Sequence, residues 1–383
     1  MSKKKVLMVF GTRPEAIKMA PLYKALHADY RTFETKVCVT AQHREMLDQV
    51  LDIFEIVPEI DLNIMKNGQS LTRLTSVILE ELEEVLKQEK PDLILVHGDT
   101  TSTLSAALAG FYAGIRVAHV EAGLRTYNIS SPFPEESNRQ IVGRLASLHF
   151  VPVDSSKENL LREGVPSEKI FVTGNTVVDA LEQCLEITRA DKGTAHRISS
   201  GLQRVIGIDC FASRIVLITG HRRENFGLGF EEICRAIETL AAKFPEVLYV
   251  FPVHLNPNVS GPVKKMLGGF QNIRLIEPLD YQQFVFLLAN AYLVLTDSGG
   301  IQEEAPSLGK PVLVMRDTTE RPEGIQAGTA KLVGADADEI VTQVSRLLSD
   351  SDLYSTMASS RNPYGDGLAS QKIVEILKGE LYR

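Results

Sequence analysis

Charged and polar side chains follow short apolar runs of this sequence, at positions where acid–base or anion-binding chemistry could take place. In the first half Arg13 and Lys18 follow one such run, Asp99 follows another and Glu121 follows a third. In the second half His221 follows an apolar run in the same way. Carboxylates and imidazoles commonly transfer protons in enzymes, whereas arginine and lysine bind phosphates. This combination indicates acid–base chemistry on a substrate that carries phosphate.

Two turns have the composition of phosphate sites. The turn at residues 11–15 puts an arginine and a lysine at an expected helix start, with a proline at the first helical position. The turn at residues 296–300 contains a serine and two glycines, which leave backbone amides open to an anion. Glu304 follows one helical turn later, where it could accept hydrogen bonds from ribose hydroxyls, and Arg321 adds a cation. A plain turn with solvated charges remains an alternative at both places.

Acidic residues also open the segment at residues 132–139, where Glu135 and Glu136 stand at an expected helix start. The helix dipole stabilises acids at that end of a helix even when they have no function. This segment alone therefore leaves a structural and a catalytic interpretation open.

Metal and redox chemistry have little support in the sequence. His119 and Glu121 share one face of a strand, but no third ligand accompanies them. No Gly-x-Gly-x-x-Gly follows the first apolar run, and no P-loop motif is present. We therefore expect no metal and no nicotinamide cofactor. Four cysteines without paired spacing indicate neither a zinc site nor a disulfide framework: Cys38, Cys184, Cys210 and Cys234.

An alternation of short apolar runs and amphipathic stretches must position these side chains. The pattern is typical of parallel sheets covered by helices on both faces, and ligands of such sheets bind beyond the carboxyl ends of the strands. Because twelve strands in one open sheet would be unusual, two doubly wound sheets are predicted. The predicted strands are 5–10, 35–40, 93–97, 116–120, 149–153, 170–173, 215–219, 248–253, 273–276, 293–296, 311–315 and 330–333.

Two segments indicate how the chain is divided. A domain boundary is expected near residues 174–176. Residues 188–213 are polar, weakly periodic and poor in large apolar side chains, which indicates a surface excursion. Residues 362–367 form a strong helix breaker, and the helical pattern that follows them could cover either domain.

Length and composition are those of a globular protein. The 383 residues exceed the roughly 150 residues of one domain, so two domains are expected. Apolar residues make up 44% and charged residues 23%, which excludes disorder, coiled coil and collagen. The net charge of −8 argues against nucleic acid or an anionic membrane as a partner. The longest apolar stretch is too short to cross a bilayer, and the N-terminus predicts a strand rather than a signal peptide, so a cytoplasmic protein is expected.

Eight segments resemble those of the non-hydrolysing UDP-N-acetylglucosamine 2-epimerases, in the same order and almost from end to end. They are Phe-Gly-Thr-Arg-Pro-Glu-Ala-Ile-Lys at 10–18, Thr-Ala-Gln-His-Arg at 40–44, Val-His-Gly-Asp-Thr at 96–100, His-Val-Glu-Ala-Gly-Leu-Arg at 119–125, Pro-Glu-Glu-Ser-Asn-Arg at 134–139, Thr-Gly-His-Arg-Arg-Glu-Asn at 219–225, Pro-Val-His-Leu-Asn-Pro at 252–257 and Thr-Asp-Ser-Gly-Gly-Ile-Gln-Glu-Glu at 296–304.

The resemblance implies an α/β fold of the glycosyltransferase-B type, in which two Rossmann-like domains face each other across a cleft and the C-terminal helix crosses back to the first domain. On this basis residues 1–174 and 364–383 are expected to form an N-terminal domain that holds the sugar and the catalytic acids. Residues 175–363 are expected to form a C-terminal domain that binds UDP. The resemblance also implies a homodimer without metal or cofactor.

Roles for individual residues follow from the resemblance. The residues implied to be essential to the chemistry are Asp99, Glu121, Glu135 and His221. The implied substrate contacts are Arg13, Lys18, Ser298, Gly299, Gly300, Glu304 and Arg321. Many bacterial members bind a second UDP-GlcNAc as an activator, and the residues matching that site are Gln42, Arg73, Glu136, Arg222 and His254. Glu45 differs from the glutamine that some activated members carry at this position.

The implied reaction interconverts UDP-GlcNAc and UDP-ManNAc, and the ManNAc would supply surface polysaccharides. Because the hydrogen on C2 of the sugar is not acidic, we expect elimination of UDP to a 2-acetamidoglucal, followed by re-addition. Three alternatives remain: a retaining glycosyltransferase of the same fold, a hydrolysing epimerase, and a sensor that binds a nucleotide sugar without turnover. Several carboxylates at strand ends argue against the sensor.

Overall fold

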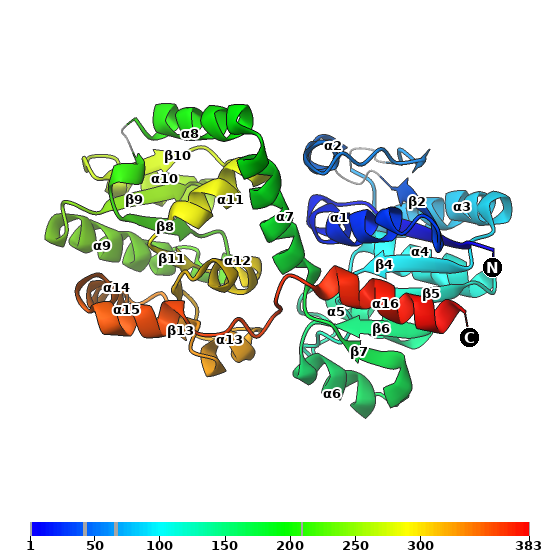
Figure 1. Ribbon diagram of the computed structural model, residues 1–383. Coiled ribbons are helices and arrows are strands. Elements are labelled where there is room, and N and C mark those ends of the chain that lie inside the picture. Colours follow the sequence, from blue (N-terminus) through cyan, green and yellow to red (C-terminus); the bar gives the residue numbers. More distant parts are fainter. Residues whose placement is uncertain (1, 41–43, 65–67, 208–209, 383) are drawn as a thin grey trace. The chain divides into compact units, whose positions relative to one another are not determined.

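The computed structural model describes residues 2–40, 44–64, 68–207 and 210–382, and it divides into two compact units. The first unit comprises Met1–Glu182 and Gly365–Arg383, and the second comprises Gln183–Tyr364 (Figure 1). Each unit contains one parallel sheet, which confirms the predicted pair of parallel α/β domains. Within the described ranges no helix has both the length and the apolar character needed to cross a bilayer.

The first unit is built on a seven-stranded sheet. Its central strands are buried almost throughout because helices cover both faces, which is why they are apolar nearly without interruption. From edge to edge the strands are β3 (Ile60–Asp61), β2 (Phe33–Val39), β1 (Lys4–Phe10), β4 (Leu93–His97), β5 (Arg116–Val120), β6 (Leu148–Val151) and β7 (Ile170–Val172).

Helices connect these strands, and one of them comes from the far end of the chain. α16 (Ala369–Leu381) packs against α1 (Arg13–Ala28), and Lys378 forms an ion pair of 3.0 Å with Asp29. Figure 1 shows α16, in red, among the elements of the first unit. The C-terminal helix therefore belongs to the first unit, as the resemblance implies. The other helices are α2 (Arg44–Ile53), α3 (Leu71–Glu89), α4 (Thr101–Tyr112), α5 (Glu135–Leu145), α6 (Asp154–Arg162) and η1 (Ser167–Lys169), with α7 (Thr176–Ala190) passing into the second unit.

The second unit is built on a six-stranded parallel sheet. Its strands, from edge to edge, are β10 (Ile273–Ile276), β9 (Leu248–Pro252), β8 (Ile215–Thr219), β11 (Leu293–Thr296), β12 (Val312–Val314) and β13 (Ala330–Leu332). Its helices are α8 (Lys192–Ile206), η2 (Cys210–Ala212), η3 (Arg223–Asn225), α9 (Leu228–Lys243), α10 (Pro257–Leu267), α11 (Tyr281–Asn290), α12 (Gly299–Glu304), η4 (Ala305–Leu308), α13 (Pro322–Gln326), α14 (Ala337–Ser349) and α15 (Ser351–Ala358).

Each predicted apolar run contains a strand, but two local predictions were wrong. The two-residue strand β3 was missed, because so short a strand shows no period. Residues 188–213 are largely at the surface but are not weakly periodic, since most of them form the last residues of α7 and the whole of α8. α8 buries only Ile198, Leu202 and Ile206, one side chain per turn. These side chains stand four residues apart, so the helical spacing was present in the sequence and was overlooked because the segment as a whole is polar.

Candidate active site

The turn after β1 is held by a buried glutamate, Glu15. Glu15 Oε2 accepts hydrogen bonds from the backbone amides of Gly11 (3.1 Å) and Thr12 (2.8 Å). Its Oε1 accepts from the hydroxyls of Thr100 (2.7 Å) and Thr103 (3.0 Å) at the start of α4. Burial raises the pKa of Glu15 although these hydrogen bonds oppose the shift. Glu15 was not among the predicted site residues, but the Thr-x-x-Glu spacing of a capping box is the signal that could have identified it.

Arg13 and Lys18 both lie on α1 but in different surroundings. Arg13 is half-buried, and within the described residues its side chain has no hydrogen-bond or ion-pair partner. Lys18 Nζ forms an ion pair with Glu121 Oε2, and both side chains are mostly buried. The structure thus joins a predicted substrate contact to a predicted catalytic acid.

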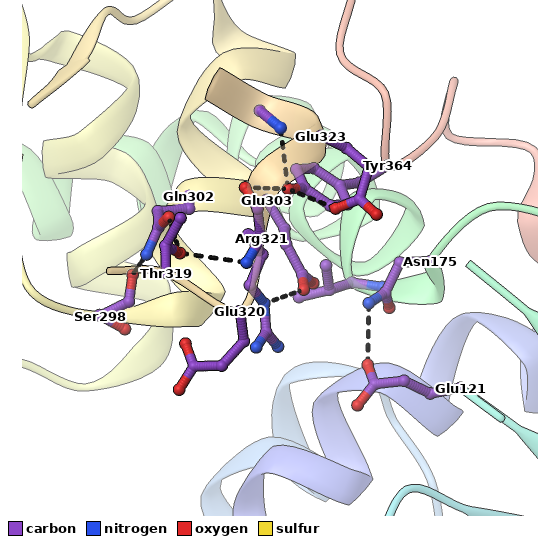
Figure 2. A network of polar contacts seen from close by, with 12 residues as sticks. Glu121, Asn175, Ser298, Gln302, Glu303, Thr319, Glu320, Arg321, Glu323 and Tyr364 are labelled. Atoms are coloured by element: carbon purple, nitrogen blue, oxygen red, sulfur yellow. Dashed lines mark hydrogen bonds and ion pairs between the residues drawn. The ribbon is translucent and has the colours of Figure 1, made fainter. Parts of the chain in front are cut away.

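Glu121 follows β5 in the left-handed conformation, with a φ of 60°. Its Oε2 also accepts a hydrogen bond of 2.8 Å from Asn175 Nδ2 (Figure 2), and it lies 3.7 Å from His97 Nε2. Burial lowers the pKa of His97 to about 4, so this ring is neutral near pH 7. A lysine and an amide therefore orient one carboxylate at the edge of the first sheet, beside the neutral ring of His97.

Asp99 lies at the end of the neighbouring strand and is held by α5. Arg139 contacts Asp99 Oδ2 through Nε (2.8 Å) and Nη2 (2.6 Å), and Asn138 Nδ2 donates to the Asp99 carbonyl (2.8 Å). Glu135 opens α5, is half-buried, and has no side-chain hydrogen bond among the described residues. α5 therefore brings Glu135 and Asp99, two predicted catalytic acids, to the same edge of the first unit.

In the second unit a buried aspartate organises the turn that carries His221. Asp297 Oδ2 accepts hydrogen bonds from the backbone amides of His221 (2.9 Å) and Arg222 (2.8 Å). Asp297 Oδ1 lies 3.3 Å from His221 Nδ1. Partial burial lowers the pKa of His221, although Asp297 opposes the shift. The ring of His221 stacks on that of His254, with the two ring centroids 5.9 Å apart.

The turn at residues 298–300, which leads into α12, is packed against Arg321. A Cβ on Gly299 would lie 3.2 Å from Arg321 Cζ, whereas one on Gly300 would meet no described atom within 4 Å. Arg321 Nε donates to Glu303 Oε1 (2.7 Å, Figure 2), and Glu304 is half-buried at the end of α12. Ser298 precedes α12 without capping it through its hydroxyl group. Four predicted contacts therefore surround one turn: Ser298, Gly299, Gly300 and Arg321.

Arg321 is also held in place by residues 362–364, which belong to a segment predicted only to break a helix. The Tyr364 hydroxyl donates to the Arg321 carbonyl (3.0 Å, Figure 2). It also accepts a hydrogen bond from the Gly324 amide (3.1 Å). Asn362 Nδ2 donates to the carbonyl of Glu303 (2.8 Å). Both partners of the Arg321–Glu303 pair are thus fixed by residues 362–364, and no pattern in the sequence indicates these contacts.

The predicted activator residues have dissimilar surroundings. Glu136 is fully buried, and it accepts from the backbone amides of Thr126 (3.0 Å) and Tyr127 (3.1 Å). Although burial opposes it, these hydrogen bonds, together with that from Gln140, lower the pKa of Glu136. Arg73 is exposed on α3, and His254 is exposed after β9. Arg222 Nε is buried and has no hydrogen-bond partner among the described residues, whereas Gln42 lies outside those residues.

Across the described ranges, no group of three His, Cys, Asp or Glu side chains is arranged to hold a metal ion. Cys38, Cys184 and Cys234 are buried free thiols. The first unit thus presents carboxylates suited to proton transfer, and the second presents a glycine turn and an arginine suited to a phosphate.

Comparisons with known proteins agree with this chemistry. The family model described as UDP-N-acetylglucosamine 2-epimerase matches residues 24–378. The UDP-N-acetylglucosamine 2-epimerase of Yersinia pestis is 60% identical over 374 residues, which are 98% of each chain.

Solved structures also resemble the chain over almost its whole length. The crystal structure of UDP-GlcNAc 2-epimerase from Neisseria meningitidis bound to UDP-GlcNAc has a TM-score of 0.88 and 52% identity, covering 97% of this chain and 99% of that one. The Methanocaldococcus jannaschii enzyme in complex with UDP-GlcNAc and UDP has a TM-score of 0.79 and 34% identity, covering 98% and 99%. These likenesses confirm the predicted fold class.

Proposed function

The chain belongs to the UDP-N-acetylglucosamine 2-epimerase family, and we propose that it interconverts UDP-GlcNAc and UDP-ManNAc by eliminating UDP and adding it back. The observation that carries this mechanism is the pairing of Glu121 with Lys18 and Asn175. A largely buried carboxylate held by two donors is suited to take up and return a proton in a fixed direction.

The elimination makes a proton available that is otherwise not acidic, because no carbonyl group adjoins C2. The C1–O bond breaks and its electron pair leaves with UDP, while a carboxylate takes the proton from C2 and a C1=C2 double bond forms. Proton delivery to the opposite face of C2 and attack of a UDP oxygen on C1 then give UDP-ManNAc. Together these two reaction steps balance in atoms and electrons, and they need no oxidant.

The acids of the first unit would move the proton. Asp99, Glu121 and Glu135 are the candidates, and positioned proton transfer contributes roughly 10²–10⁴-fold to rate. Arg13 and Lys18 would bind the substrate beside them. Their arrangement at adjacent strand ends and at the start of α5 supports this assignment.

The second unit would hold the departing UDP. Arg321 and the turn at 298–300 would bind its pyrophosphate, and Glu304 would bind its ribose. Asp297, which accepts from the His221 amide and lies 3.3 Å from Nδ1, would hold the imidazole so that Nε2 faces the leaving group. Losing one such fixed donor costs about 3 kcal/mol of transition-state stabilisation in comparable anion sites.

An experiment in heavy water tests the elimination. The enzyme is incubated with UDP-GlcNAc alone in D₂O, and the products are followed by NMR. We expect UDP-ManNAc that carries deuterium at C2. UDP-ManNAc that retains only protium at C2 would contradict the elimination, and release of UDP only when an acceptor sugar is added would indicate a glycosyltransferase.

We also propose that UDP-GlcNAc activates the enzyme at a second site, to which the family resemblance assigns Gln42, Arg73, Glu136, Arg222 and His254. The exposed Arg73 and His254 support direct contacts, whereas Glu136 would act by holding residues 126–127. Initial rates measured from UDP-ManNAc should rise when small amounts of UDP-GlcNAc are added. A rate independent of added UDP-GlcNAc would exclude activation.

A homodimer is proposed on the basis of an apolar hollow between α3 and α4. Its volume is about 730 Å³, and its lining includes Leu79, Leu86 and Ile115. Tyr112 at its rim is 73% exposed, which is unusual for so large a ring. Sedimentation should give a dimer for the unaltered chain and a monomer for Tyr112→Asp. A monomeric unaltered chain would exclude this proposal.

The product is proposed to supply ManNAc to surface polysaccharides. UDP-ManNAc is an activated sugar, so a reaction that oxidises or transfers its sugar must consume it. Cells that lack the gene should lose ManNAc-derived units from their surface polysaccharide, and an unchanged sugar composition would contradict this role.

A further inference from the structure

We infer that His119 is a positioning residue for Asp99, because its imidazole holds the carbonyl group of Gly98 and so sets the direction in which Asp99 leaves the sheet. This inference rests on the proposed function, since it concerns an acid of the epimerase reaction. His119 stands in one of the segments that carry the family resemblance, but no role was assigned to it.

The contact lies where the sheet's own hydrogen bonding ends. β4 ends at His97, and the Gly98 amide still donates to the Val120 carbonyl of β5 (3.0 Å). Gly98 then adopts a φ of 68°, which turns the chain out of the sheet. Its carbonyl group faces His119 Nε2 at 2.7 Å. The imidazole of His119, on β5, thus gives the Gly98 carbonyl group a hydrogen-bond partner where the β-ladder has ended.

The protonation state of His119 defines its part in this contact. The side chain is 1% exposed, and burial lowers its pKa to about 3, so the ring is neutral near pH 7. A carbonyl oxygen only accepts hydrogen bonds, so the hydrogen is on Nε2. Nδ1 is buried and has no hydrogen-bond partner in the described part of the chain. His119 therefore acts as a donor.

Glycine makes this donor necessary. Gly98 occupies both signs of φ with little penalty, so the peptide between Gly98 and Asp99 could rotate if its carbonyl group were not held. Asn138 and Arg139 hold Asp99 from α5, and His119 holds the preceding residue from β5. Displacing a reacting group by 1 Å can slow catalysis by about 100-fold.

His149 offers a matched control in the same sheet. It lies on β6 directly opposite His119 in the strand register and is also 1% exposed. Burial lowers its pKa to about 4, but its hydrogen bond goes to the backbone of Ala146. Substituting His149 therefore disturbs a similarly buried imidazole that lies beside His119 but whose hydrogen bond goes to Ala146 rather than to the turn at residues 98–99.

The test compares side chains of equal length with and without a donor. His119→Gln and His119→Met are made in the full chain, beside His149→Gln and His149→Met, and kcat and KM are measured with UDP-GlcNAc. We expect kcat of His119→Met to be about tenfold or more below that of His119→Gln, with KM within about twofold, since misplacement affects the reacting geometry. The His149 pair should show no such difference.

Each result has one interpretation. If the unaltered chain forms no UDP-ManNAc, the proposed function fails. If it does, and His119→Met equals His119→Gln in kcat, the positioning role is wrong. A second measurement does not depend on variants: histidine ¹⁵N NMR of the unaltered chain should show His119 with hydrogen on Nε2. Hydrogen on Nδ1 would overturn the inference even if the variants do not fold.

Discussion

Lys18 on α1 and Glu121 after β5 form an ion pair although 103 residues separate them in the chain. The side chains are 15% and 11% exposed, so both charges are largely removed from water. Removing one partner from such a pair leaves the other charge uncompensated. The two residues are therefore expected to act as a unit.

A double-mutant cycle tests that expectation. Lys18→Met and Glu121→Gln should each lower kcat/KM by at least about 100-fold, in line with the loss of a positioned proton-transfer group. The double variant should be little worse than either single variant, because groups that act together are not additive. Losses that multiply in the double variant would show that the two side chains act independently.

Gly299 and Gly300, the first two residues of α12, should respond differently to substitution by alanine. Gly299→Ala places a Cβ 3.2 Å from Arg321 Cζ, so we expect it to lower the free energy of unfolding by about 1–3 kcal/mol and to weaken UDP binding. Gly300→Ala should leave stability unchanged or raise it by up to about 1 kcal/mol, because alanine favours a helix. Urea unfolding and UDP titration measure both quantities. Equal destabilisation by the two substitutions would contradict the packing of Arg321 on Gly299.

His221→Ala separates turnover from binding. If His221 acts on the leaving UDP, kcat should fall by about 100-fold or more, as for other fixed donors in anion sites, whereas UDP affinity should change much less. Steady-state kinetics and UDP titration provide the comparison. Equal losses in kcat and in UDP affinity would make His221 a binding residue only.

Three buried histidines should make the protein sensitive to acid. Burial lowers the pKa of His97 and His149 to about 4 and that of His119 to about 3, from 6.5 for an unperturbed histidine. Below pH 6.5 the unfolded chain therefore binds protons that the folded chain does not. Stability falls as the pH decreases toward 4, by about 1.4 kcal/mol per pH unit for each histidine.

Urea unfolding between pH 7 and pH 5 measures this slope. His149→Gln should reduce it by about 1.4 kcal/mol per pH unit, the contribution of one proton. Glu15, whose pKa burial raises, acts in the opposite sense, because its protonation favours the folded chain as the pH falls. Stability that does not change between pH 6.5 and pH 5 would show that these histidines are not neutral and buried in solution.

Local patterns predicted much of the fold. Apolar runs identified the strands, because a strand covered on both faces must be apolar along its length. Asp99 and Glu121 could be placed at strand ends because each follows directly after one of these apolar runs. β3 was missed because a two-residue strand shows no period, whereas α8 was missed although Ile198, Leu202 and Ile206 follow each other at helical spacing within a polar segment.

The sequence by itself determined which residue types follow each strand and to which family the chain belongs. Only the tertiary structure decided which of them meet: Lys18 with Glu121, His119 with Gly98, and Tyr364 with Arg321. These partners come from segments that are apart in the chain and become neighbours through strand order, with β4 between β1 and β5, or through a long return of the chain. Periodicity within a segment reports how that segment is buried, but it contains no information about which other segment covers it.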